Sequence, residues 1–223
     1  MSQYKLHWIS GSPNSWRVLL TLAFKGIEYD SQRINPASWD REGSGFFDLN
    51  PRGKVPVIED GDTIIYESIA IMAYLEAKHP EQPIFGNSAD QTGFIWQRIA
   101  ELMHYTLEPV YELSRLLMRE TALDEIDHSK QLVQIISEEL TNINAQLANA
   151  SYLSGNELSA VDIYFYPAIA FLEKMLVLPA ATLLNIDFNP INEKLPNLSN
   201  WMSEIEKMRG FEDAYPPHWR DEK

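Results

Sequence analysis

The sequence predicts an α/β domain followed by an all-helical domain. Two observations carry this prediction. The first 80 residues alternate short β-type runs with helical runs, in the order β-α-β, a loop, then β-β-α, and the remainder shows long stretches of helical periodicity. The turn-forming segment Pro80-Glu81-Gln82-Pro83 separates the two patterns. We therefore expect one domain at residues 1–80 and a second at residues 88–223.

The first domain begins with a β-α-β unit. Residues 4–9 alternate in polarity and are bulky, which predicts a strand. Residues 16–25 are strongly apolar and end at Gly26, which is typical of a helix with glycine just after its last turn. Residues 29–34 predict a second strand. Two strands joined by such a helix are parallel and have a right-handed crossover.

The remaining elements follow in order. Residues 55–59 and 63–66 predict two strands of a hairpin around an Asp-Gly-Asp turn, and residues 67–79 predict a helix. Beyond the boundary the helical stretches are 88–119, 128–149, 159–176 and 197–209. The third of these begins with Ser159 and Asp162, a spacing that predicts a capping box, and we interpret it as structural.

Composition excludes several functional classes. The 223-residue chain has no cysteine, so it offers no disulfide framework, thiolate zinc site, iron–sulfur cluster or cysteine nucleophile. Its 18 Lys and Arg against 32 Asp and Glu argue against binding to nucleic acid or to an anionic membrane surface. We find neither a secretory signal nor an apolar run approaching about 18 residues. These features predict a soluble, cytoplasmic protein.

The negative charge is unevenly distributed. Residues 1–80 have a net charge of −2, whereas residues 81–223 have −12. The acidic helical half is either a partner surface or, more commonly, a solvated face.

The turn between the first strand and the first helix is the first candidate site, because open α/β sheets bind ligands at such positions. It presents the hydroxyls of Ser10, Ser12 and Ser15 and the amide of Asn14 beside a helix N-terminus. This environment favours an anion, including a thiolate. The alternative interpretation is helix capping, with Asn14 or Ser15 as the N-cap.

The second candidate is the segment Gly53-Lys54-Val55-Pro56-Val57. A proline ahead of a short β run marks the start of an edge strand, and spacing alone favours that interpretation. A cis Val55–Pro56 bond is the alternative. It would turn the N–H and C=O of Val55 outward, where an extended peptide could pair with them.

The third candidate is Glu67-Ser68, where a strand ends and a helix begins. The Ser68 hydroxyl and the unpaired N–H groups of the first helical turn suit a carboxylate, and Glu67 suits an ammonium group. Together they fit the head group of an α-amino acid. Taken alone, the pair is equally consistent with an ordinary helix N-cap.

The ordered set of motifs resembles the glutathione S-transferase family. The first half has the β-α-β unit, Asn50-Pro51-Arg52-Gly53-Lys54-Val55-Pro56, then Asp60-Gly61-Asp62 and Glu67-Ser68-Ile69-Ala70-Ile71. The helical half has Ser159-x-x-Asp162 and Leu195-Pro196-Asn197-Leu198-x-x-Trp201. The resemblance covers nearly the whole chain. It implies a thioredoxin-like N-terminal domain that binds glutathione, an all-α C-terminal domain and a homodimer.

The resemblance also implies roles for individual residues. Ser12 would donate a hydrogen bond to the glutathione sulfur, with Asn14 as the second candidate for thiol activation. The main chain of Val55, with Pro56 cis, would pair with the cysteinyl part. Glu67 and Ser68 would hold the γ-glutamyl amine and carboxylate. Two basic residues complete the set: Lys54 near the glutathione backbone and Arg41 on the glycyl carboxylate.

Two departures argue against a maleylacetoacetate isomerase. The zeta-class isomerases have Ser-Ser-Cys where this chain has Ser12-Pro13-Asn14, and their substrate-binding arginine is replaced by Lys174. The Ser-Pro-Asn pattern also resembles bacterial and fungal members in which an asparagine near this position contacts the sulfur. Because the chain has no cysteine, it cannot form a mixed disulfide with glutathione on its own thiol.

The family resemblance implies a hydrophobic electrophile as second substrate and no metal. Its site would include one helix, expected to kink at Pro109, through Met103, Tyr105, Glu108 and Tyr111. Residues 216–219 would cover the site or dock on the surface. The function predicted is glutathione transfer. The alternatives are glutathione-dependent peroxidase or disulfide reductase activity, and a non-catalytic binding or regulatory protein on the same fold.

Overall fold

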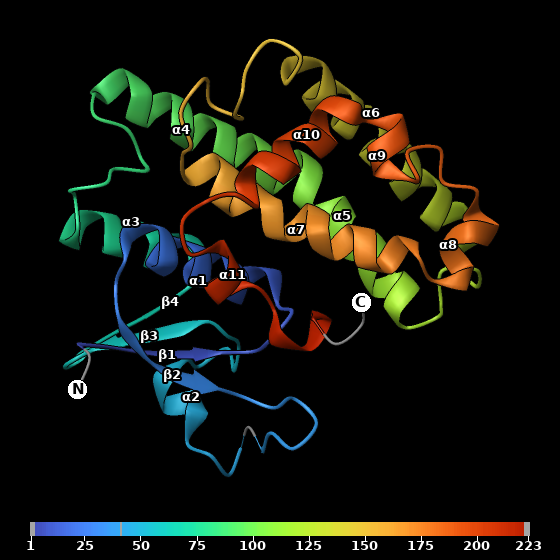
Figure 1. Ribbon diagram of the computed structural model, residues 1–223. Helices are drawn as coiled ribbons and strands as arrows, with labels where there is room; N and C mark the ends of the chain where they lie inside the picture. Colours follow the sequence, from blue (N-terminus) through green and yellow to red (C-terminus); the bar gives the residue numbers. More distant parts are fainter. Residues whose placement is uncertain (1–2, 41, 221–223) are drawn as a thin grey trace. The chain divides into compact units, whose positions relative to one another are not determined.

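The computed structural model describes residues 3–40 and 42–220, which form two compact units (Figure 1). Unit 1 contains the described residues of 1–83 together with those of 208–223, and unit 2 spans Ile84–Lys207. Unit 1 holds a four-stranded sheet with helices, whereas unit 2 is helical, as the sequence predicts.

The sheet of unit 1 has the strand order β2-β1-β3-β4. β1 and β2 are parallel, with Tyr4 opposite Tyr29 and Trp8 opposite Arg33, which confirms the predicted β-α-β unit. β3 pairs antiparallel with β1 and with β4. The strands are β1 (Tyr4–Trp8), β2 (Tyr29–Arg33), β3 (Val57–Asp60) and β4 (Thr63–Tyr66).

Helices cover both faces of this sheet (Figure 1). α1 (Pro13–Lys25) and α3 (Ser68–Lys78) lie side by side on one face. Tyr4, Leu6 and Trp8 are buried, whereas the alternate side chains of β1 are more exposed, as the two-residue period of a strand requires. On the other face the short helix α2 (Phe46–Leu49) places Phe46 edge-on to His7, with ring centroids 5.9 Å apart.

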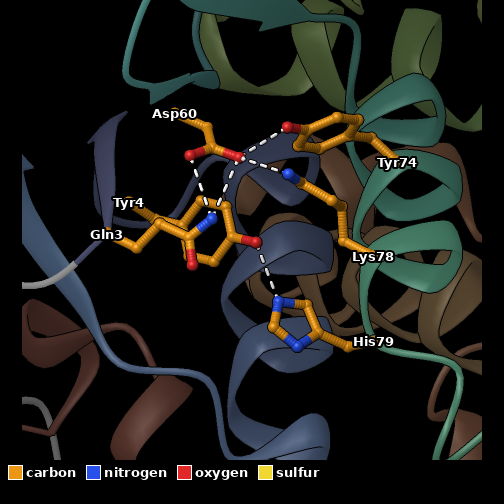
Figure 2. A network of polar contacts seen from close by, with 6 residues as sticks. All are labelled: Gln3, Tyr4, Asp60, Tyr74, Lys78 and His79. Atoms are coloured by element: carbon orange, nitrogen blue, oxygen red, sulfur yellow. Dashed lines mark hydrogen bonds and ion pairs between the residues drawn. The ribbon is translucent and has the colours of Figure 1, made fainter.

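A polar cluster anchors the β3–β4 hairpin to α3 (Figure 2). The hydrogen bond from Tyr74, the largest cause, holds the pKa of Asp60 below its usual value. The same bond raises the pKa of Tyr74. Nearby, Tyr4 Oη lies 2.8 Å from His79 Nε2. Three side chains contact the Asp60 carboxylate: Tyr74 Oη at 2.6 Å, Gln3 Nε2 at 3.0 Å and Lys78 Nζ at 3.2 Å.

The segment after residue 207 packs in unit 1, whereas the sequence-based boundary assigned it to the helical domain. It contains α11 (Phe211–Ala214) and a 3-10 turn, Pro217–Trp219. Its aromatic rings explain the difference, because they surround the buried indole of Trp16 on α1. The centroid distances to Trp16 are 6.0 Å for Phe211, 5.6 Å for Tyr215 and 5.5 Å for Trp219.

Unit 2 is built around α7 (Ala160–Leu176), in which 13 of the 17 residues are buried. Two residues before Pro109 the chain ends a π-helical segment, Leu102–Leu107, close to where the sequence predicts a kinked helix. Proline lacks the N–H that a regular turn would use there. The helices are α4 (Ala89–Glu101), α5 (Glu108–Met118), α6 (Ile126–Gln146), α7 (Ala160–Leu176), α8 (Pro179–Leu184), α9 (Ile191–Lys194) and α10 (Pro196–Ile205).

The predicted capping box at the start of α7 is present. Asp162 accepts hydrogen bonds from Ser159 N at 2.9 Å, Leu153 N at 2.9 Å and Trp201 Nε1 at 2.8 Å. Desolvation nevertheless raises the pKa of this fully buried carboxyl. Across the described part of the chain, no helix combines the length and apolar character needed to cross a membrane.

Candidate functional site

Three candidate segments meet at one edge of the sheet. Because β1 and β3 are antiparallel, the end of β1 lies beside the start of β3, where Val55 is found. Tyr66 at the end of β4 is opposite Val57, so Glu67 follows at the same edge. The register therefore gathers the Ser12 turn, Val55 and Glu67, as a site built from all three requires.

Ser12 is the N-cap of α1, a position that the capping interpretation gave to Asn14 or Ser15. Its Oγ accepts a hydrogen bond from Ser15 N at 3.4 Å, and its carbonyl accepts one from Trp16 N at 2.9 Å. A hydroxyl that accepts still has its own proton to donate. Among the described residues, that proton has no acceptor.

Asn14 and Ser15 differ from Ser12 in their surroundings. Ser15 is fully buried, and its Oγ accepts a hydrogen bond from Ile9 N at 3.3 Å, which is a structural contact within the turn. Asn14 is exposed, and its Oδ1 accepts a bond from Arg17 at 2.6 Å. This bond fixes the Asn14 amide while leaving its NH₂ group as a donor.

Arg17 links two parts of the site and was given no role from the sequence. Its guanidinium is buried, at 2% residue exposure, and Nη1 donates to Asn14 Oδ1 and, at 3.3 Å, to Ser68 Oγ. The first residue belongs to α1 and the second to α3. The available signal was a charged residue within a strongly apolar helix, because such a residue is buried only when it is paired.

Val55 presents an unpaired main chain. The Val55–Pro56 bond is cis, as the family resemblance implies and as spacing alone did not predict. Val55 precedes β3, and neither its N–H nor its C=O has a hydrogen-bond partner in the described residues. A peptide in extended conformation can pair with both groups.

Asn50 shapes the loop before Val55; the sequence placed it in the family motif but gave it no role of its own. It is 2% exposed. Its Nδ2 donates to the Lys54 carbonyl at 2.7 Å, and its Oδ1 accepts from Arg52 N at 3.0 Å. The Lys54 side chain is exposed and has no ion-pair partner among the described residues. Arg41 lies outside the described residues.

The start of α3 is an open helix terminus. Glu67 occupies the N-cap position with φ 70° and ψ 116°, and its exposed side chain makes no capping bond. Such a backbone conformation costs about 1–3 kcal/mol in a residue other than glycine. Within the described chain the N–H groups of Ser68, Ile69 and Ala70 have no acceptor. Arg17 bonds to Ser68 Oγ, which leaves the Ser68 proton free to be donated.

These groups match an α-amino acid head group. Free N–H groups at a helix N-terminus, a hydroxyl donor and the buried cation behind it favour a carboxylate. The neighbouring Glu67 carboxylate favours an ammonium group. Within the described residues, no group of three or more His, Asp or Glu side chains could hold a metal ion.

The expected electrophile-binding residues lie in unit 2, on the run from the π-helical segment into α5. Tyr105 is 64% exposed and Glu108 is exposed, whereas Met103 and Tyr111 are half-buried. One helical run therefore carries all four side chains.

The C-terminal residues 216–219 dock on unit 1. The indole of Trp219 is buried against Trp16, and His218 Nδ1 lies 2.7 Å from Ser10 Oγ in the candidate turn. The segment therefore contacts the candidate turn within unit 1.

The fold defines a class of protein with a thioredoxin-like domain followed by an all-helical domain. Two family models match in that order: the glutathione S-transferase N-terminal domain at residues 11–78 and the C-terminal domain at residues 113–208. The chain belongs to the glutathione S-transferase family.

Three known proteins are similar to this chain over nearly its whole length, one in sequence and two in structure. It is 24% identical to glutathione S-transferase Z2 of Arabidopsis thaliana over 212 residues, covering 94% of this chain and 88% of the relative. A crystal structure of a glutathione S-transferase from the Antarctic clam Laternula elliptica matches with a TM-score of 0.82 and 27% identity, covering 99% and 95% of the two chains. The glutathione transferase URE2P6 from Phanerochaete chrysosporium, solved in complex with oxidized glutathione, has a TM-score of 0.80 at 18% identity, covering 99% and 96%.

Proposed function

We propose that this protein binds glutathione, activates its thiol and conjugates the glutathione sulfur to a hydrophobic electrophile in the cytoplasm. The observation that carries the proposal is the open N-terminus of α3, which Arg17 links to the turn bearing Ser12. Family membership supports glutathione as the ligand.

Glutathione would lie extended along the edge where the three segments meet. Its γ-glutamyl carboxylate would accept bonds from Ser68 and the first N–H groups of α3, and its amine would face Glu67. The cysteinyl main chain would pair with the free N–H and C=O of Val55. This arrangement leaves the thiol beside Ser12. Lys54 and Arg41 are the proposed contacts for the rest of the tripeptide.

Thiol activation requires little free energy. A free thiol has a pKa of about 8.5, and lowering it by two units requires about 2.7 kcal/mol of preferential stabilisation of the thiolate. One charge-assisted hydrogen bond from Ser12 and the N-terminus of α1 are sufficient for this. The thiolate then forms a carbon–sulfur bond, and the leaving group departs with its electron pair. We propose that Met103, Tyr105, Glu108 and Tyr111 bind the electrophile. We also propose that the protein is a homodimer.

The test combines calorimetry with kinetics. The wild-type protein should bind glutathione at millimolar concentration or below and conjugate a halo-aromatic electrophile. Ser12→Ala should lower kcat roughly 10- to 100-fold, because the thiolate loses its hydrogen bond, with little change in glutathione affinity. Ser38→Ala, at an exposed serine of unit 1, is the matched control and should leave both unchanged.

Each other outcome has a defined meaning. Unchanged activity in Ser12→Ala together with a loss in Asn14→Ala would assign thiol activation to Asn14. Binding of glutathione without conjugation, but with turnover of hydroperoxides or disulfides, would indicate the peroxidase or reductase alternative. No binding at millimolar glutathione would reject the proposal and favour a non-catalytic binding protein.

A further inference from the structure

An open surface cavity of about 370 Å³, most of whose lining residues are exposed, lies on the other flank of the Ser12 turn, within unit 1. It sits at the carboxyl ends of the parallel strands β1 and β2, where Trp8 is opposite Arg33 and Ile34 N donates to the Trp8 carbonyl at 2.8 Å. Ligands of open α/β sheets bind at such strand ends. Its lining residues are Ser10, Arg33, Ile34, Asn35, Pro36 and His218.

Arg33 gives the cavity a positive charge. Its guanidinium lies 5.7 Å from the centroid of the Trp8 ring, and Trp8 is itself fixed by a bond from Nε1 to Ser31 Oγ at 2.8 Å. No carboxylate forms an ion pair with Arg33 in the described part of the chain. The guanidinium is thus positioned by an aromatic face, and its N–H donors remain available to a ligand.

Two further polar side chains, Asn35 and His218, are held in place by contacts within the cavity wall. Asn35 Oδ1 already accepts a bond from Ala37 N at 3.1 Å, which leaves the NH₂ group of that amide for a ligand. His218 is held by Ser10 on one ring nitrogen. It also packs tightly on Gly11, where a Cβ would lie 2.7 Å from His218 Cε1. Glycine at this position, with φ 78°, is therefore required for the close approach of His218.

The lining contains no carboxylate, although the chain has 32 Asp and Glu. Arg33 and Asn35 can each donate hydrogen bonds to a ligand, the bonded pair of Ser10 and His218 can donate one more, and the apolar residues Ile34 and Pro36 complete the lining. A planar guanidinium suits a carboxylate, which it binds through two N–H groups, and the apolar residues suit a hydrocarbon body.

We propose that this cavity binds the carboxylate of a small organic acid. Val55, Glu67 and Ser68 lie toward β3 and β4, whereas the cavity lies toward β2, so the acid and glutathione would flank the Ser12 turn from opposite sides. The acid is then a further class of electrophilic substrate, beside the hydrophobic electrophile assigned to Met103, Tyr105, Glu108 and Tyr111, and this assignment rests on the proposed function. Binding of the acid by this cavity does not depend on the proposed function.

Binding is tested first with benzoate and its neutral analogue benzamide, by calorimetry. Benzoate should bind and benzamide should not. Arg33→Gln should weaken benzoate binding at least about tenfold, the effect of losing one charged hydrogen bond, whereas Arg33→Lys should retain part of it. Arg119→Gln removes the same charge from an exposed position in unit 2 and should have no effect.

Several binding results would overturn the proposal: no benzoate binding at millimolar concentration, equal binding of benzamide, or unchanged binding in Arg33→Gln. Inorganic phosphate that binds more tightly than benzoate would indicate a phosphate site instead. If glutathione displaces benzoate and Arg33→Gln weakens both equally, the cavity holds the glycyl carboxylate of glutathione, which also rejects the proposal.

Kinetics then test the role of the acid as substrate. 4-Chloro-3,5-dinitrobenzoate and the neutral 4-chloro-3,5-dinitrobenzamide react by the same substitution. The thiolate forms a bond to the ring carbon that bears chlorine, and chloride leaves with its electron pair. Arg33→Gln should lower kcat/KM about tenfold for the benzoate only. An equal loss for both compounds would contradict the assignment. Arg33-dependent benzoate binding in a protein that fails to bind glutathione would reject the proposed function and leave the acid site standing.

Discussion

The N-termini of α3 and α7 carry similar residues and have opposite patterns of hydrogen bonding. At α7 each early N–H group has a partner: Ala160 N donates to the Ile84 carbonyl at 2.8 Å, and Val161 N donates to Ser159 Oγ at 3.2 Å. At α3 the corresponding N–H groups have no acceptor in the described chain, and Glu67 turns its side chain outward. The N-terminus of α7 is closed by hydrogen bonds from within the protein, whereas the N-terminus of α3 is open.

This difference distinguishes a structural polar cluster from a binding site. Unpaired donors near the surface cost little while water solvates them, and they favour a ligand that replaces the water. The positive φ of Glu67 has the same implication, because strain at a helix start persists where function selects it. At α7, by contrast, the polar atoms are used entirely to hold the fold.

The largest expected effect comes from opening the closed terminus. Asp162→Ala would leave the buried donors Ser159 N, Leu153 N and Trp201 Nε1 without an acceptor, so the free energy of unfolding should fall by about 3–5 kcal/mol. Denaturant titration of the variant measures this loss. Asp127→Ala, which removes an exposed first-turn acid from α6, should change stability by less than about 0.5 kcal/mol. A loss below about 1 kcal/mol at Asp162 would break the comparison.

At the open N-terminus of α3 we expect an intermediate effect, a rise in the free energy of unfolding where the change at α7 lowers it. Glu67→Gly should raise the free energy of unfolding by about 1 kcal/mol, because glycine tolerates φ 70°, and should weaken glutathione binding. Thermal unfolding and calorimetry measure the two changes. Glu120→Gly is the control: Glu120 is exposed at φ 61° outside the candidate site, so it should gain stability with unchanged binding. Equal binding in both variants would contradict the role of Glu67.

The smallest effect is expected at Asp60, in a polar cluster close to the surface. Its folded-state pKa lies below the usual 3.8, chiefly because Tyr74 donates to it. Its contribution is therefore present above about pH 4 and lost as pH falls through the lowered pKa. Asp60→Asn should reduce stability at pH 7 by up to about 1 kcal/mol and flatten the loss below pH 4. Denaturant titrations between pH 2 and pH 7 measure both effects, and an unchanged acid slope would exclude Asp60 as its source.

The long elements could be predicted because their periodicity is local. The strands, the parallel pairing of β1 with β2 and the four main helical stretches all follow from apolar spacing and turn residues. The short helices α2, α8, α9 and α11 were not predicted. Helices of four to six residues are marginal on their own, so tertiary contacts such as that of Phe46 with His7 determine them.

The candidate site also contains residues that the sequence could predict and residues that it could not. Ser12, Val55 and Glu67-Ser68 were visible as residues at element boundaries, and the strand register brings their segments to one edge. Arg17 and Asn50 act through burial and hydrogen bonds to residues distant from them or in the main chain, which residue spacing does not reveal. Likewise, nothing local indicates that residues 208–220 return to Trp16.

The packing of residues 211–219 around Trp16 has a consequence for the synthesis of the protein. Trp16 is synthesised early, but the aromatic rings that surround it belong to residues 211–219. At about 5–20 residues per second, the ribosome needs on the order of ten seconds to add the intervening unit. Until then the indole face of α1 remains uncovered on the nascent chain. The first domain to emerge is therefore the last to be completed, and chaperones have their longest opportunity to bind at α1.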